Sequence, residues 1–175
     1  GDSRLAWTEF MMYGGMPFVM DKDGHAEKAA YLQGLFEKTY ITDVIERNQL
    51  KASKGVLEDL LNYLASSVGS LTNATRLENT FKSTKKQNIA HQTISAYIDH
   101  FIDAFIIKKA ERYDIKGRKY IGAQQKYFFT DVGLRNARLN FRQQEENHIM
   151  ENILYNELTA RGFSVDVGVG KATLI

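Results

Sequence analysis

The sequence predicts a mainly α-helical fold with a small β component. The first observation is a run from His91 to about Ala104 and just beyond, in which apolar residues keep the spacing of one helix face, i, i+3, i+4, i+7, i+8 and i+11: Ile94, Tyr97, Ile98, Phe101, Ile102 and Phe105. The second is a pair of β-prone runs, 105–109 and 126–129, which are able to pair as an antiparallel hairpin. With a short helix before them, these elements form the pattern of a winged helix-turn-helix.

The expected organisation has three parts. Residues 1–50 form a helical segment, residues 51–130 the winged helix-turn-helix domain, and residues 131–175 the incomplete start of an α/β unit. At 175 residues with 43% apolar content, the chain is long enough for one ordinary core or two small ones. A single proline and 25% charged residues argue against a disordered or linker-rich chain.

Composition also excludes several classes of site. The chain has no cysteine, which rules out disulfides, thiolate zinc sites, iron–sulfur clusters and cysteine nucleophiles, and fits a reducing, cytoplasmic compartment. No apolar run approaches about 18 residues, so we expect no membrane span and no membrane partner. The four histidines show no metal-ligand spacing such as i, i+4, and no metal site is expected from them: His25, His91, His100 and His148.

The N-terminal part reads as helices separated by breaks. Residues 5–20 start helically and break at Gly14-Gly15, and residues 26–48 keep a helical period over one long helix or two joined helices. The glycine pair is not a phosphate loop, because no lysine followed by serine or threonine comes after it. The pair is therefore read as a turn.

The next helices lead into the basic stretch. A helix is expected from Lys54 to about Val68, and Asn73 is the expected N-cap of a short helix, Ala74 to Phe81. A polar, basic connector, residues 83–88, then precedes the long helix. This order of elements supports the helix-turn-helix interpretation.

The C-terminal part continues with helix and strand signals. Asp131 is expected to cap a short helix, Val132 to Arg138, and a strong helix is expected from His148 to Arg161 with a stop at Gly162. Residues 163–167 alternate as a strand. This sequence of elements is typical of the start of an α/β unit.

Positive charge is concentrated between Leu71 and Gly122. This stretch holds ten Lys and Arg residues against five acids, a local charge of +5; since the whole chain carries +2, the remainder carries −3. Such asymmetry is the electrostatic footprint of a module that faces phosphate. We therefore expect double-stranded DNA as a partner, bound mostly through its backbone.

The expected DNA contacts come from the connector, the N-terminal turn of the long helix, and the loop between the two β-prone runs, where a wing would lie. Asp99 and Asp103 on the outer face of the helix would repel phosphate, which confines contact to its N-terminal turn. The candidate DNA-binding residues are Lys85, Lys86, His91, Gln92, Thr93, Ser95, Lys116, Arg118 and Lys119.

Three stretches, in this order and spacing, resemble one protein family: Tyr13 to Pro17; Leu71 to Asn73 with Thr93 to Ile98 and Phe105 to Ile107; and Tyr127 to Leu134 followed by Glu151 to Leu158. Nearly the whole chain is similar to the C-terminal half of a widespread group of prokaryotic predicted AAA+ superfamily ATPases. Members of that group join an N-terminal P-loop ATPase, a helical lid, a winged helix and a C-terminal domain of unknown function with a PD-(D/E)XK nuclease-like core.

The resemblance implies that residues 1–50 are a lid or linker segment and that residues 131–175 begin the nuclease-like domain. It also implies ATP and Mg²⁺ as ligands of the parent protein, and the missing N-terminal ATPase domain as a partner. This chain has no Gly-x-x-x-x-Gly-Lys-Ser/Thr motif. We therefore expect no cofactor and no enzymatic activity in the chain as it stands.

By the same resemblance, Glu151 matches the first acid of the nuclease-like core and is the candidate catalytic residue. A metal-dependent hydrolase needs several convergent carboxylates, whereas Glu157, six residues later, lies about 120° around the helix from Glu151. After Val167 the chain reads Gly168 to Lys171, without the acid-x-Lys pair of the family. The alternative is that Glu151 caps the helix or pairs locally.

Two alternatives to DNA binding stay open. The first is a protein-interaction or oligomerisation module that packs against the ATPase or a sister subunit in a homo-oligomer, since many winged helices in larger ATPases serve as contact modules. The second is a remnant of a metal-dependent nuclease-like domain.

Overall fold

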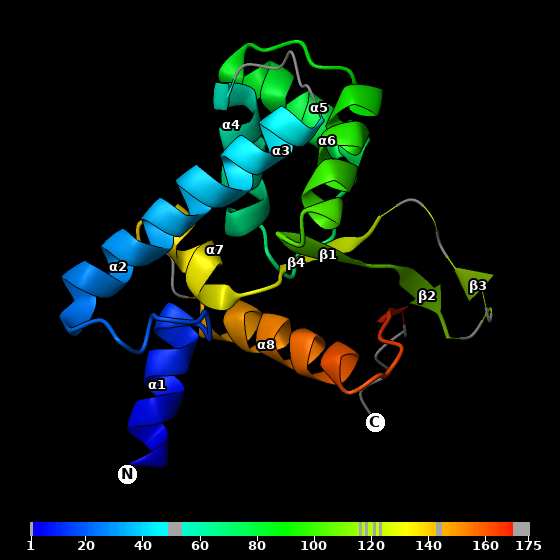
Figure 1. Ribbon diagram of the computed structural model, residues 1–175. Coiled ribbons are helices and arrows are strands. Elements are labelled where there is room, and N and C mark those ends of the chain that lie inside the picture. The colour runs from blue at the N-terminus through cyan, green and yellow to red at the C-terminus, as the bar shows by residue number, and fades with distance from the viewer. Residues whose placement is uncertain are drawn as a thin grey trace.

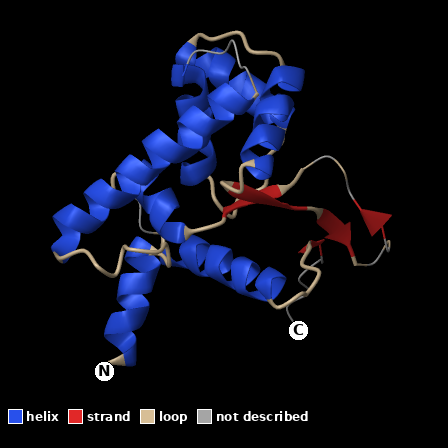
Figure 2. Ribbon diagram, viewed as in Figure 1, coloured by secondary structure: helices blue, strands red, loops and turns tan. Residues whose placement is uncertain are grey.

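The computed structural model describes residues 2–48, 54–115, 117, 119–120, 122, 124–142 and 145–169. Helices dominate and the strands gather on one side (Figure 1, Figure 2), which confirms the mainly α-helical class with a small β component. The helices and π-helical turns are α1 (Ser3–Tyr13), α2 (Gly24–Leu35), η1 (Phe36–Ile41), α3 (Thr42–Arg47), α4 (Lys54–Ser66), α5 (Ala74–Thr80), η2 (Phe81–Lys85), α6 (His91–Asp103), α7 (Val132–Arg138) and α8 (Glu146–Ala160). The strands are β1 (Ile107–Ala110), β2 (Arg112–Asp114), β3 (Lys119–Tyr120), β4 (Lys126–Phe129) and β5 (Val167–Val169).

Helix boundaries follow the capping residues of the sequence. At the start of α5, Asn73 accepts the N–H of Arg76 at 2.8 Å, and at the start of α7, Asp131 accepts the N–H of Leu134 at 3.1 Å. Gly162 follows α8 with a φ of 84°, a conformation that glycine adopts without strain. These predicted caps are confirmed.

No helix in the described ranges is long and apolar enough to cross a membrane.

One expectation about the connector is wrong. Ser83 to Lys85 are helical, as part of η2, and the chain leaves the helix only at Lys86, where φ is 53°. The hydroxyls of Ser83 and Thr84 donate to the carbonyl oxygen of Thr80 at 3.1 and 2.7 Å. Such side-chain bonds satisfy carbonyl groups near a helix end, which extends the helix beyond its apolar pattern.

The strands form two small sheets. β1 and β4 pair antiparallel with Ile107 opposite Phe129, which confirms the expected hairpin. β2 lies in the middle of a second sheet of order β3-β2-β5, antiparallel to β3 and parallel to β5. The strand expected at 163–167 is therefore placed too early: it begins at Val167, because that residue is the first to align with β2, opposite Arg112.

Side chains alternate across β4 and contribute to two cores. Tyr127 and Phe129 belong to the main cluster, which extends from Val19 to Ala137 and draws on residues from all three expected parts of the chain. Phe128 points to the other side and stacks on Tyr155 of α8, with ring centroids 4.5 Å apart. β4 therefore links the helices of the main core to α8.

α8 is fixed to β4 by a buried amide. Asn152, only 1% exposed, donates to the carbonyl oxygen of Phe129 at 2.7 Å and accepts the N–H of the same residue at 2.9 Å. Asn156 also donates to the Phe129 carbonyl oxygen, at 2.8 Å. The Asn152 amide thus pairs with the backbone of β4 as a neighbouring strand would, and satisfies a buried edge.

α7 joins distant parts of the sequence. Asp131, its N-cap, also accepts the N–H of Gly15 at 2.7 Å, across 116 positions of sequence. A Cβ added to Gly133 would lie 1.9 Å from the carbonyl oxygen of Tyr13, so the end of α1 and the first turn of α7 are in direct contact. Two of the stretches that carry the family resemblance, Tyr13 to Pro17 and Tyr127 to Leu134, therefore meet here.

We expect the variant Asp131→Asn to reduce the dependence of stability on pH. Burial raises the pKa of the Asp131 carboxyl above its ordinary value of 3.8, although the N–H groups of Gly15, Leu134 and Gly133 lower it. The folded protein therefore holds this proton to a higher pH than the unfolded chain, so the contribution of Asp131 to stability declines as pH rises from about 4 through the raised pKa. Urea unfolding at intervals from about pH 4 to 7 measures the decline. An unchanged pH profile in the variant would contradict this assignment.

Candidate nucleic-acid interface

α5 and α6 form a helix pair with a buried inner face. Leu77 and Phe81 on one side and Ile94 and Ile98 on the other are at most 3% exposed. Lys86, in the left-handed region, ends η2 and turns the chain toward α6. Figure 1 shows α6 descending from this turn to β1. The local pattern thus places one helix face in the core and leaves the turn at the surface.

The outer side of this pair is polar and exposed. The connector is extended from here on by its flanking residues to 82–90, and it is exposed from Lys82 to Lys86 and again at Asn88 and Ala90. On the first turns of α6, Gln92 and Ser95 are exposed, whereas Thr93 is half-buried. The structure therefore brings the predicted contact residues between 85 and 95 into one contiguous surface segment.

Two of these residues contact acids of the same protein. The ammonium group of Lys85 lies 2.9 Å from the Asp59 carboxylate on α4. His91 contacts the Glu78 carboxylate of α5 twice, through its backbone N–H at 3.2 Å and through ring Nδ1 at 3.1 Å. Glu78 thus occupies the N-terminal end of α6, where a phosphate would otherwise meet the helix. Sequence reasoning missed both acids, since they precede the connector and lie on other helices.

Lys82 and Lys86 differ from Lys85. Among the residues that the structure describes, neither forms an ion pair with an acid. Lys82 was not among the predicted contacts. Its spacing of three and four residues from Lys85 and Lys86 would have placed it on the same helix face as these two lysines. These two lysines leave the connector positively charged.

The expected wing lies partly outside the described residues. Lys116 and Arg118 are not among them, and for Lys119 only the backbone is described, in register with Asp114 in the β2–β3 ladder. The connection between β1 and β4 is not a plain loop, because β2 and β3 pair within it. β5 covers the other edge of β2, so this hairpin is tied to the C-terminal part of the chain.

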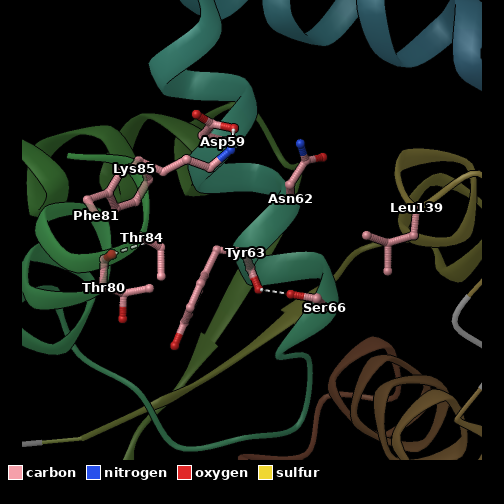
Figure 3. A pocket seen from close by; sticks show the side chains of 9 residues that line it. All are labelled: Asp59, Asn62, Tyr63, Ser66, Thr80, Phe81, Thr84, Lys85 and Leu139. Carbon is pink, nitrogen blue, oxygen red and sulfur yellow. Dashed lines mark hydrogen bonds and ion pairs between the residues drawn. The ribbon is translucent and has the colours of Figure 1, made fainter. Parts of the chain in front are cut away.

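A cavity of about 290 Å³ lies behind the connector, between α4 and η2. Figure 3 shows the Lys85–Asp59 pair above the ring of Tyr63, with Phe81 beside it. Asn62, which also lines the cavity, accepts a hydrogen bond from Arg138 Nε at 2.7 Å. The ion pair therefore bridges the connector and α4 over a partly apolar hollow.

Glu151 forms an ion pair with a residue of the neighbouring strand β4. Its Oε1 atom lies 2.5 Å from the ammonium group of Lys126 on β4. Glu157, on the same helix, pairs instead with Arg161 at 2.5 Å. In the described ranges no group of three or more His, Asp or Glu side chains could hold a metal ion. Of the residues that stand after Val167 in place of the family's acid-x-Lys pair, Gly168 and Val169 belong to β5, and Gly170 and Lys171 lie outside the described residues.

This is a mainly helical protein in which a helix pair with an exposed basic connector leads into an antiparallel strand pair. The chain belongs to the family described as "Domain of unknown function (DUF8612)", whose model matches residues 4–145. It is similar to a protein of Haemophilus influenzae described as an uncharacterized protein, with 36% identity over 169 residues. The match covers 95% of this chain but 42% of that relative, so the chain spans less than half of the relative's length. No solved structure matches the chain.

Proposed function

We propose that this chain is the DNA-binding winged-helix region of a prokaryotic AAA+-type ATPase, and that it contacts the backbone of double-stranded DNA. α5 and α6 take the places of the two helices of a helix-turn-helix, with α6 as the recognition helix, and the β1–β4 pair takes the place of the wing stem. The observation that supports DNA contact most is the exposed basic connector directly before the exposed first turns of α6.

The contacts divide by chemistry. Lys82 and Lys86 are suited to phosphate, because both are exposed and cationic and neither is paired with an acid among the described residues. Gln92 and Ser95 offer hydrogen-bonding groups on the outer face of α6, where base edges would lie. Asp99 is exposed further along the same helix and keeps phosphate away from its C-terminal half. Binding is therefore mostly electrostatic and weakly selective for sequence.

The parent assignment rests on the resemblance to predicted ATPases. The Haemophilus influenzae relative extends well beyond the region that this chain matches, which leaves room in that protein for an ATPase domain. ATP and Mg²⁺ would bind there, and the present chain would take no part in hydrolysis. The absence of cysteine supports a reducing, cytoplasmic location.

Fluorescence anisotropy on labelled duplex DNA across a salt series tests the proposal. We expect binding that weakens steeply with salt, and Lys86→Gln should weaken it on all sequences and reduce the slope of log affinity against log salt by about 0.9. Lys22→Gln is the matched control, since Lys22 precedes α2 and lies over the Tyr31 ring, outside the proposed surface. If the protein does not bind DNA at low salt, or if its affinity does not change with salt concentration, the proposal is wrong.

A second candidate function is a protein-interaction module. α1 buries none of its 11 residues, and Trp7 and Phe10 are 42% and 40% exposed. The C-terminal end of α1 packs against α7, where Asn136 donates to the carbonyl oxygens of Met11 and Met12, but these two aromatic rings stay exposed, so a partner surface such as the ATPase domain or a sister subunit would cover them. Sedimentation velocity on the same sample separates the two candidates. The interaction module predicts self-association that weakens in Trp7→Ser, with no effect of DNA.

A further inference from the structure

One basic residue of the proposed DNA surface is held by an acid of the chain itself. Lys85 ends η2, and Asp59 lies 26 positions earlier, on α4. Figure 3 shows the Lys85 side chain extending from η2 to the Asp59 carboxylate. At 2.9 Å, the ammonium group donates a charge-assisted hydrogen bond to that carboxylate.

We infer, on the basis of the proposed function, that Asp59 competes with DNA phosphate for Lys85 and restrains the affinity of this surface. Carboxylate and phosphate oxygens are both acceptors for the same ammonium group. While Lys85 donates to Asp59, the carboxylate offsets part of its attraction for phosphate, and its side chain is directed to α4. The surface then binds phosphate through Lys82 and Lys86, and Lys85 contributes only after its pair opens.

Because the Lys85–Asp59 pair is exposed, Asp59 holds Lys85 only weakly against a competing DNA phosphate. The Lys85 side chain is 51% exposed and that of Asp59 is 22% exposed, so water and salt screen their attraction. Exposed pairs of this kind shift an equilibrium by only a few-fold. A DNA phosphate that approaches the connector can therefore recruit Lys85, but with a lower gain in affinity than an unpaired lysine would give.

Asp59 is a better position for a test than Glu78. Glu78 engages His91 in a similar way, but it also accepts the backbone N–H of His91 at the start of α6. Its removal would disturb the helix end as well as the charge. Asp59 contacts the connector through a side chain alone in the pair described, so Asp59→Asn changes the competition while keeping a side chain of similar shape.

A double-mutant cycle on duplex DNA tests the inference. We expect Asp59→Asn to bind about three-fold more tightly than the wild type. We expect it to have a salt slope steeper by about 0.9, because Lys85 becomes an additional phosphate contact. Lys85→Gln alone should weaken binding less than Lys86→Gln does, and Asp59→Asn should lose its effect when Lys85 is already glutamine.

Asp99→Asn is the control for charge. It removes the same charge from an exposed position on α6, so its effect should be the same with and without Lys85. Thermal unfolding followed by circular dichroism verifies that each variant is folded at the assay temperature. A gain in Asp59→Asn that persists without Lys85, no gain at all, or a loss in Lys85→Gln as large as that in Lys86→Gln overturns the inference.

These outcomes are separable from those of the proposed function. If the wild type binds in a salt-dependent way and Lys86→Gln weakens it, while Asp59→Asn changes nothing, only the restraint by Asp59 is wrong. If Asp59→Asn binds DNA and the wild type does not, the proposed function of the wild type is wrong, and so is the expected three-fold size of the restraint by Asp59. If neither binds, both proposals are wrong.

Discussion

Replacing Gly133 by alanine is expected to destabilise the protein by more than about 3 kcal/mol. A Cβ at this position would lie 1.9 Å from the carbonyl oxygen of Tyr13 and 2.3 Å from its carbonyl carbon. These are backbone atoms at the end of α1, which cannot rotate away as a side chain would. Either α1 or α7 must shift, and both are held by Asp131, which caps α7 and accepts the N–H of Gly15.

Gly34→Ala provides the matched control. Gly34 lies in α2 and has no atom within 4 Å of an added Cβ. Alanine is a better helix former than glycine, so this variant should be more stable by up to about 1 kcal/mol. Urea unfolding curves of both variants measure the two effects. Equal midpoints for Gly133→Ala and the wild type would show that α1 and α7 are not in the contact described.

The second large effect is expected for Asn152→Ala, which should lower stability by about 2–4 kcal/mol. Asn152 supplies both a donor and an acceptor to the Phe129 backbone, and its side chain is buried. Alanine leaves the N–H of Phe129 without this partner at a buried position. Removal of one partner from a buried pair leaves the desolvation penalty of the other uncompensated.

Asn156→Ala is the informative comparison. Asn156 donates to the same carbonyl oxygen and to that of Thr130, at 2.8 and 3.1 Å, but gives nothing to the Phe129 N–H. In this variant Asn152 still satisfies both groups of Phe129, so the loss should be smaller than in Asn152→Ala. Guanidinium unfolding of the two variants decides this. The reverse order would mean that the paired amide is not what fixes α8 to β4.

Local signals in the sequence predicted most of the helices. The apolar spacing from Ile94 to Ile102 matches α6, and the stretch from Val132 to Arg138 matches α7 at both ends. Phe105, expected on the same buried face, lies beyond the end of α6 with a φ of 55° and is 76% exposed, so that part of the prediction is wrong. The matching predictions succeed because helix periodicity and capping depend on residues within a few positions of each other. The connector was misread because two hydroxyl side chains extend the helix into it, an effect that the apolar pattern does not contain.

The candidate site was only partly accessible from the sequence. Exposure of Gln92 and Ser95 follows from their place on the outer face of a periodic helix, and that of Lys86 from its place in the polar connector before it. The contact between Lys85 and Asp59 does not, because nothing in the order of residues states which acid of α4 will face the connector. The DNA contacts themselves stay a prediction that the binding experiments must test.

The sequence by itself determined the helical class, the capped ends of the helices and the concentration of positive charge between Leu71 and Gly122. Only the tertiary structure decided that Gly15 meets Asp131, that Asn152 pairs with Phe129, and that β5 joins β2. The physical reason is the range of the interactions. Periodicity and caps are set within one or two helical turns, whereas these contacts join segments up to 116 positions apart and depend on the path of the whole chain.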